Sequence, residues 1–159
     1  MPKLLKNNSV IDDQWQVLAT NTDDIPEGPV IVPLTLWQEK RAELKERAPI
    51  GVWLNSDQPP ADIIADLDKL SVVAINFPMF TDGRGFSYAR ELREQHGYKG
   101  EIRAIGAFIR DQLFYMKRCG FDSFALNNSN LEEALQSFND FSNAYQASVD
   151  QPRPLFRRR

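Results

Sequence analysis

The segment Asp82-Gly83-Arg84-Gly85 carries the residue types best suited to binding chemistry in this chain. Its arginine, flanked by glycines, presents a fork of N–H donors to a carboxylate, a phosphate or another oxyanion. A helical pattern follows at once, so backbone N–H groups at the helix start point in the same direction. A second interpretation needs no ligand: Asp82 caps the helix, and Arg84 pairs with Asp82 or Asp111. The segment is neither a dinucleotide fingerprint nor a P-loop, so it leaves both interpretations open.

Other polar residues follow the predicted strands and should meet the same arginine, because the carboxyl ends of parallel strands gather at one edge of a sheet. Asp111 is a candidate general base there, with Arg84 as the anion holder; the alternative is that Asp111 only favours a helix start. The predicted ligand-binding residues are Asn55, Asn76, Thr81, Asp82, Gly83, Arg84, Gly85, Arg110, Asp111 and Asn127, with Ser56 and Asp57 beside them.

The remaining reactive side chains offer little chemistry. His96 is the chain's one histidine and stands before Gly97, where it is expected to cap a helix end. Cys119 is the one cysteine and is expected to be a half-buried, inert thiol, which excludes an internal disulfide and a thiolate metal cluster held by this chain alone. The sequence shows no metal-ligand cluster and no evident cofactor motif.

Alternating strand and helix patterns must position these residues. Strands are predicted at 30–32, 50–54, 72–75, 102–106 and 121–126, and helices at 36–47, 61–67, 86–95, 108–119 and 131–145. This alternation predicts an α/β fold of consecutive βα units in a mainly parallel sheet, either a partial (βα) barrel or an open doubly wound sheet. An unclosed sheet leaves edges to cover, so we expect a homodimer or an N-terminal cover strand.

Turn-forming and helix-breaking residues divide the chain into three regions. Residues 1–29 form an N-terminal arm in which Asn7 and Asn8 indicate a hairpin, residues 30–146 form the α/β domain, and residues 147–159 form a Pro/Arg-rich tail. The tail is interpreted either as a solvated end or as a docking peptide. In the second case Leu155 and Phe156 are apolar anchors, while Arg157 and Arg158 steer toward an acidic partner.

Composition limits the class of partner. The net charge of −3 argues against a nucleic-acid partner, which requires a basic surface. No apolar run approaches the length that spans a bilayer, and charged residues interrupt the first twenty positions where a signal peptide would be apolar. We therefore expect a cytoplasmic protein without a membrane partner.

Three phrases together resemble one bacterial family: residues 80–87 (FTDGRGFS), 97–106 (GYKGEIRAIG) and 110–122 (RDQLFYMKRCGFD). Members of this family of unknown function are described as probable oxidoreductases of sulfite reduction, and their genes lie beside a haemoprotein sulfite or nitrite reductase. The resemblance implies a role in assimilatory sulfur metabolism, toward cysteine synthesis. It supplies no catalytic residue.

The resemblance and the residues lead to three hypotheses. Since the sequence has no visible redox motif, the preferred one is an accessory protein that acts with the reductase haemoprotein or its electron donor. The second is a small-molecule enzyme that binds an anion around Arg84. The third is an oxidoreductase whose flavin or nicotinamide site is completed by dimerisation.

Overall fold

The computed structural model describes residues 3–7, 9–22, 24–79, 82–108 and 112–125. Its strands are β1 (Lys3–Lys6), β2 (Ser9–Asp12), β3 (Gln16–Val17), β4 (Val30–Pro33), β5 (Ile50–Leu54), β6 (Val72–Phe77), β7 (Glu101–Gly106) and β8 (Ser123–Phe124). Its helices are α1 (Leu34–Glu39), α2 (Arg41–Leu44), the 3₁₀ helix η1 (Pro60–Lys69), α3 (Arg84–Arg90), the π-helix η2 (Glu91–Gln95) and α4 (Leu113–Cys119).

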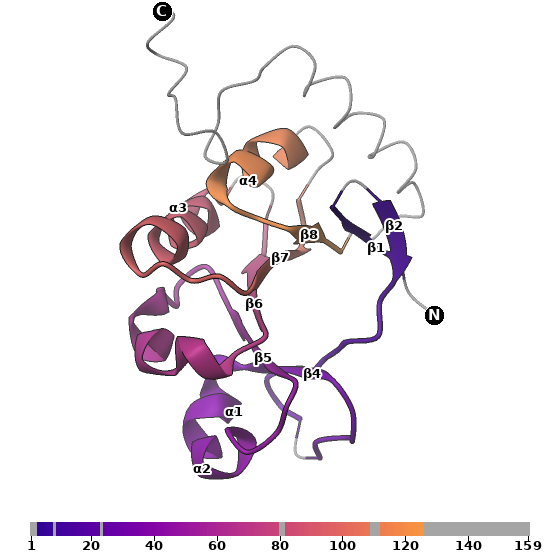
Figure 1. Cartoon of the computed structure of the whole chain (residues 1–159), viewed down its shortest axis with the longest axis vertical. Helices are drawn as coiled ribbons and strands as arrows, with labels where there is room; N and C mark the ends of the chain where they lie inside the picture. Colours follow the sequence, from indigo (N-terminus) through magenta and orange to yellow (C-terminus); the bar gives the residue numbers. More distant parts are fainter. Residues whose placement is uncertain (1–2, 8, 23, 80–81, 109–111, 126–159) are drawn as a thin grey trace, which may run out of the picture.

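The strands form one eight-stranded sheet in the order β2-β1-β8-β7-β6-β5-β4-β3. The six strands from β8 to β3 are parallel, and β1 and β2 pair antiparallel at one end. The sheet curls into a half-barrel, and the helices lie along its outer side (Figure 1). The predicted class of consecutive βα units in a mainly parallel sheet is therefore confirmed, and the curvature corresponds to the partial barrel.

Side chains on both faces of the central strands are buried, which explains their nearly continuous apolar sequence. On β6, Val73, Ile75 and Phe77 belong to the large core beneath the helices. Val72 and Ala74 alternate with them and belong to a smaller cluster on the concave face. The concave face is thus a packed surface rather than a solvated one.

The N-terminal arm covers both edges of the βα sheet. After β1 and β2, which form a hairpin around Asn7, the chain crosses to the far edge, where β3 pairs parallel with β4. β1 pairs with β8 at the opposite edge. Edge coverage by N-terminal strands is one of the two solutions expected from the sequence, and it leaves the edges of β4 and β8 paired within the chain.

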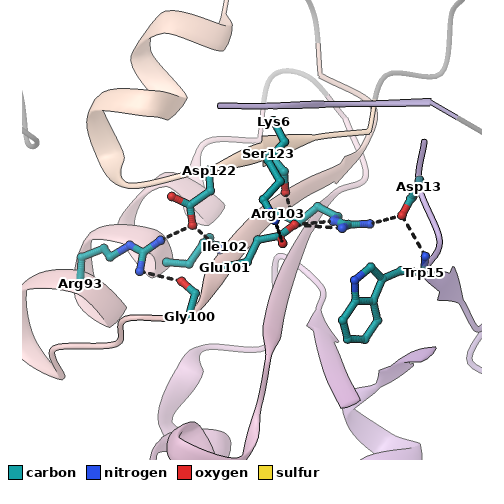
Figure 2. Close-up of polar contacts among 10 residues, drawn as sticks. All are labelled: Lys6, Asp13, Trp15, Arg93, Gly100, Glu101, Ile102, Arg103, Asp122 and Ser123. Carbon is teal, nitrogen blue, oxygen red and sulfur yellow. Dashed lines mark hydrogen bonds and ion pairs between the residues drawn. The ribbon is translucent and has the colours of Figure 1, made fainter. Parts of the chain in front are cut away.

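Arginine 93 ties the amino-terminal ends of the last strands together. Its guanidinium donates to the carbonyl oxygens of Tyr98 and Gly100 at 2.7 and 2.8 Å and to that of Gly120 at 3.1 Å. It also pairs with Asp122, whose carboxylate accepts from the backbone N–H of Ile102 at 2.9 Å (Figure 2). One side chain thereby fixes the turns that precede β7 and β8.

Several predicted bounds were wrong. The helix expected over 36–47 begins earlier, at Leu34 after Pro33, and is divided at Lys40 into α1 and α2. The helix expected over 61–67 is a longer 3₁₀ helix, and of the strand expected over 121–126 the described residues 121–125 contain only the two residues of β8. Of the segment expected to be helical over 108–119, Leu113–Cys119 form α4, while residues 109–111 lie outside the described chain, as do residues 131–145.

In the part of the chain that the structure describes, no helix has the length and apolar character needed to cross a membrane.

Candidate functional site

Two asparagines meet where β5 and β6 end. Asn55 directly follows β5, and Asn76 is the penultimate residue of β6, the neighbouring parallel strand. The Nδ2 of Asn76 donates to the Oδ1 of Asn55 at 3.0 Å, and the backbone N–H of Ser56 donates to the same oxygen at 3.0 Å. This hydrogen-bonded pair belongs to a polar surface, here called the rim, which consists of Asn55, Ser56, Asn76, Asp82, Arg84 and Tyr88.

Gly106 leaves space for the side chain of Asn76 in the rim. Gly106 ends β7 opposite Phe77 and has a φ of +94°, a conformation that favours glycine. A Cβ atom there would lie 2.3 Å from the Oδ1 of Asn76 and 2.6 Å from the carbonyl oxygen of Phe77. A larger residue would therefore displace Asn76 from the rim.

Arg84 reaches the rim from the first residue of α3. Its Nη2 donates to the Oδ2 of Asp82 at 2.9 Å and to the Oγ of Ser56 at 3.0 Å, and its Nε donates to the other oxygen of Asp82 at 3.2 Å. The backbone N–H of Arg84 also donates to Asp82 at 3.2 Å. The helix-start carboxylate and the arginine are thus paired with each other, as the ligand-free interpretation of this segment expects.

These contacts set the charge states of the rim. The side-chain hydrogen bond from Arg84, with those from Ser56 and the Arg84 backbone, holds the pKa of Asp82 far below its usual value. The same carboxylate raises the pKa of Arg84. The Arg84 side chain is nevertheless 59% exposed, whereas that of Asp82 is 15% exposed. An anion from solvent can therefore approach the guanidinium, but it competes with a carboxylate already in place.

Tyr88 is a rim residue absent from the residues predicted to bind a ligand. Its hydroxyl donates to the backbone carbonyl of Ser56, and partial burial raises its pKa, so the hydroxyl remains protonated. The sequence could have indicated Tyr88 as a neighbour of Arg84, because it lies four residues later and so on the same face of the helix. The sequence placed Ser56 at the edge of the sheet but did not indicate its contact with Arg84, because that contact depends on tertiary structure.

The two glycines beside Arg84 differ. A Cβ at Gly85 would lie 2.8 Å from the Cγ2 of Ile75 and from two ring atoms of Phe77, so α3 packs directly on β6 at this point. A Cβ at Gly83 would meet only the ring of Phe86, at the ordinary distance of 3.6 Å. Gly85 therefore places Arg84 by allowing close packing.

The described residues thus bring Asn55, Asn76, Asp82 and Arg84 together, with Gly83 and Gly85 on either side of the arginine. The other predicted ligand-binding and docking residues lie outside the described residues: Thr81, Arg110, Asp111, Asn127, Leu155, Phe156, Arg157 and Arg158.

Cys119 and His96 lie away from the rim contacts. The Cys119 side chain is fully buried, rather than half-buried as predicted, and burial raises the pKa of its thiol. His96 directly follows η2, and its Nε2 lies 3.3 Å from a carboxylate oxygen of Glu91, the first residue of that helix. Within the described ranges, no group of three His, Cys, Asp or Glu side chains is arranged to hold a metal ion.

A comparison with protein families matches residues 51–156, more than half of the chain, to the model of a bacterial protein of unknown function (DUF934). No curated protein matches the chain.

Proposed function

We propose that this chain, which belongs to the DUF934 family of bacterial proteins of unknown function, is a cytoplasmic accessory protein of assimilatory sulfite reduction. It acts with the sulfite or nitrite reductase haemoprotein or with the electron donor of that enzyme. The three phrases at residues 80–87, 97–106 and 110–122 support the pathway, because they resemble a family described in that context.

The observation that carries the accessory role is the environment of Cys119. A thiol that exchanges electrons with a disulfide must be accessible and must ionise readily. The single cysteine of this chain is fully buried, and burial raises its pKa, which are the properties of an inert packing residue. These properties support a protein that assists a partner's redox centre rather than one that carries electrons on its own thiol.

Growth of a strain lacking this gene tests the pathway. With sulfate or sulfite as sole sulfur source the strain should grow poorly, and sulfide or cysteine should restore growth. Rescue by sulfite would move the requirement to a step before sulfite reduction. Normal growth on sulfate would reject the role altogether.

The tail supplies a docking hypothesis for the same function. Leu155 and Phe156 followed by Arg157 and Arg158 combine apolar anchors with positive charge, which suits an acidic protein surface. A chain shortened after residue 150 should recover less reductase or electron donor in a pull-down than the full chain. A matched full-length variant with both anchors changed to serine separates the anchors from the arginines. Equal recovery by all three proteins would reject the tail as the anchor.

A second candidate function is the binding of a small anion at the rim. The contact of Arg84 with Ser56, beside the hydrogen-bonded pair Asn55 and Asn76, favours it, because several donors and acceptors converge on one exposed surface. Calorimetric titration with sulfite and with phosphate tests it. Arg84→Ala should abolish binding, whereas Arg90→Ala, which removes a half-exposed arginine paired with Glu94, should not. Equal binding by both variants would exclude the rim.

A further inference from the structure

The concave face of the sheet is crossed by five residues of the N-terminal arm, 13–17, here called the strap. The strap begins after Asp12, the last residue of β2, and ends at β3, which pairs with β4 over only two residues. Val17 is exposed, while the next residue, Leu18, is buried in the main core. The strap is thus flanked by the β1–β2 ladder on one side and by the buried Leu18 on the other, and its own ladder with β4 spans only two residues.

Two strap side chains face the sheet. The carboxylate of Asp13 accepts from the Nη1 of Arg103 at 2.9 Å (Figure 2). The indole of Trp15 packs against the apolar cluster of the concave face. The backbone N–H of Trp15 donates to the same carboxylate oxygen of Asp13 at 3.0 Å. This bond joins the negative group and the aromatic group into one unit.

The surface beneath the strap combines the cation Arg103 with an apolar cluster. Arg103 projects from β7, and its side chain is 2% exposed. The buried residues of the concave cluster are Ile31, Val72, Ala74 and Ile105, with Trp53 and Ala125 packed against them.

Removal of the strap would leave this surface intact. Arg103 also donates through Nε and Nη2 to Glu101 at 3.1 and 2.9 Å, and Glu101 is held in turn by Lys6 and Ser123 (Figure 2). When Asp13 leaves, Arg103 therefore keeps a carboxylate partner, and only its Nη1 is freed. A buried ion pair that loses its sole partner is strongly destabilising, and that penalty is avoided here.

We propose that the strap is an internal ligand, and that the concave face beneath it binds an anion with an apolar body. The Asp13 carboxylate occupies the position of the anionic group on Arg103. The Trp15 indole occupies the position of the apolar body on the concave cluster. Displacement of the strap exposes this site, so the strap is an autoinhibitory contact. The proposal is independent of the function assigned above.

The variant Asp13→Asn weakens the contact while preserving the side-chain shape. Its matched control is Asp12→Asn, which removes the neighbouring carboxylate, paired with Lys3 at the surface. Hydrogen exchange of the full chain, followed by NMR, reports opening at the amide of Gln16, which donates to the Pro29 carbonyl oxygen at 3.1 Å. Loss of a charge-assisted bond should speed this exchange about tenfold in Asp13→Asn. Asp12→Asn and the amides of β6 should show no change.

Two dyes probe the uncovered site. Anilinonaphthalene sulfonate is an aromatic anion and should gain several times more fluorescence with Asp13→Asn than with the wild-type chain or Asp12→Asn. Nile red, which is apolar and neutral, should show a smaller difference because it cannot use Arg103.

Four outcomes would overturn the proposal. Unchanged exchange at Gln16 would mean that Asp13 does not hold the strap. Equal acceleration at Gln16 and in β6 would mean that the whole fold, and not the strap, is destabilised. Faster Gln16 exchange without added dye fluorescence would mean that no binding surface lies beneath. Equal gains for the two dyes would remove the anion-binding role of Arg103.

Discussion

Replacement of Gly85 by alanine tests how the fold positions Arg84. The added methyl group would lie 2.8 Å from Ile75 and from the Phe77 ring, well inside ordinary van der Waals contact. Because both partners are buried in the core under α3, the helix must move away from β6 to accept it. The structure therefore predicts a loss of stability although alanine is the better helix former.

The magnitude follows from two opposing effects. Inserting one methyl group into a packed core costs about 1–3 kcal/mol, and the three approaches of 2.8 Å at Gly85 put this case at the upper end, about 2–3 kcal/mol. Alanine returns about 1 kcal/mol over glycine within a helix, so the net loss should be about 1–2 kcal/mol. With a urea dependence of about 2 kcal/mol/M, the midpoint of unfolding should fall by about 0.5–1 M.

Urea unfolding followed by tryptophan fluorescence measures this midpoint, and Gly83→Ala is the matched control on the other side of Arg84. Gly83 has a φ of −92°, and a methyl group there makes only ordinary contact. The control should therefore stay within about 0.5 kcal/mol of the wild-type chain. Equal midpoints for the two variants would refute the close packing of α3 on β6, and with it the proposed positioning of Arg84.

Three further predictions concern buried and partly buried groups. Native chain should react with a thiol reagent at pH 8 at least about a hundredfold more slowly than urea-unfolded chain, because Cys119 is buried; equal rates would contradict the inert thiol. Burial tends to raise the pKa of Glu101, but hydrogen bonds from Lys6 and Ser123 and the charge of Arg103 bring it below the ordinary value of 4.5. The stabilisation from Glu101 is thus complete above pH 4.5 and is lost as the pH falls through the lower folded value, so the stability of Glu101→Gln should vary less with pH below 4.5; an unchanged acid slope in urea titrations would count against this. Arg93→Ala should cost about 2–3 kcal/mol, since the carbonyl oxygens of Tyr98, Gly100 and Gly120 lose a donor and the partly exposed Asp122 loses its cation. Arg90→Ala, which removes a pair with Glu94, should cost about 1 kcal/mol or less; comparable midpoints would show that Arg93 does not hold the turns before β7 and β8.

The sequence predicted the sheet well because buried parallel strands leave a local signal. The β-branched run that begins at Val72 predicted a strand over 72–75, and the observed β6 extends it by two residues to Phe77. The alternation of such runs with helical patterns was sufficient to predict the α/β fold class. The helices were less predictable, because the division at Lys40 and the 3₁₀ geometry of residues 60–69 depend on how each segment meets the sheet.

The arm shows what local patterns cannot predict. β3 is two residues long, both exposed, and its partner in β4 lies fourteen positions away along the chain. The contact of Asp13 with Arg103 joins residues ninety positions apart. The sequence therefore indicated a cover strand in the N-terminal arm without indicating which edge of the sheet it covers.

The contacts of the candidate site were likewise predicted only in part. Asn55 and Asn76 were expected to meet because adjacent parallel strands end together, and Asp82 was named as a partner of Arg84 from its position in the sequence. The contacts of Ser56 with Arg84 and Tyr88 were not predicted, because they depend on how α3 packs on β6 beside the loop that follows β5. Gly85 was assigned to ligand binding, and its close packing on β6 became evident only from the structure.

The accessory role in sulfite reduction is tested most directly with purified components. The rate of sulfide formation from sulfite is measured for the reductase and its electron donor, with and without a saturating amount of this chain, and binding to each is measured by calorimetry. The account predicts saturable binding to at least one component and faster sulfide formation. Absence of binding to both, together with an unchanged rate, would contradict it.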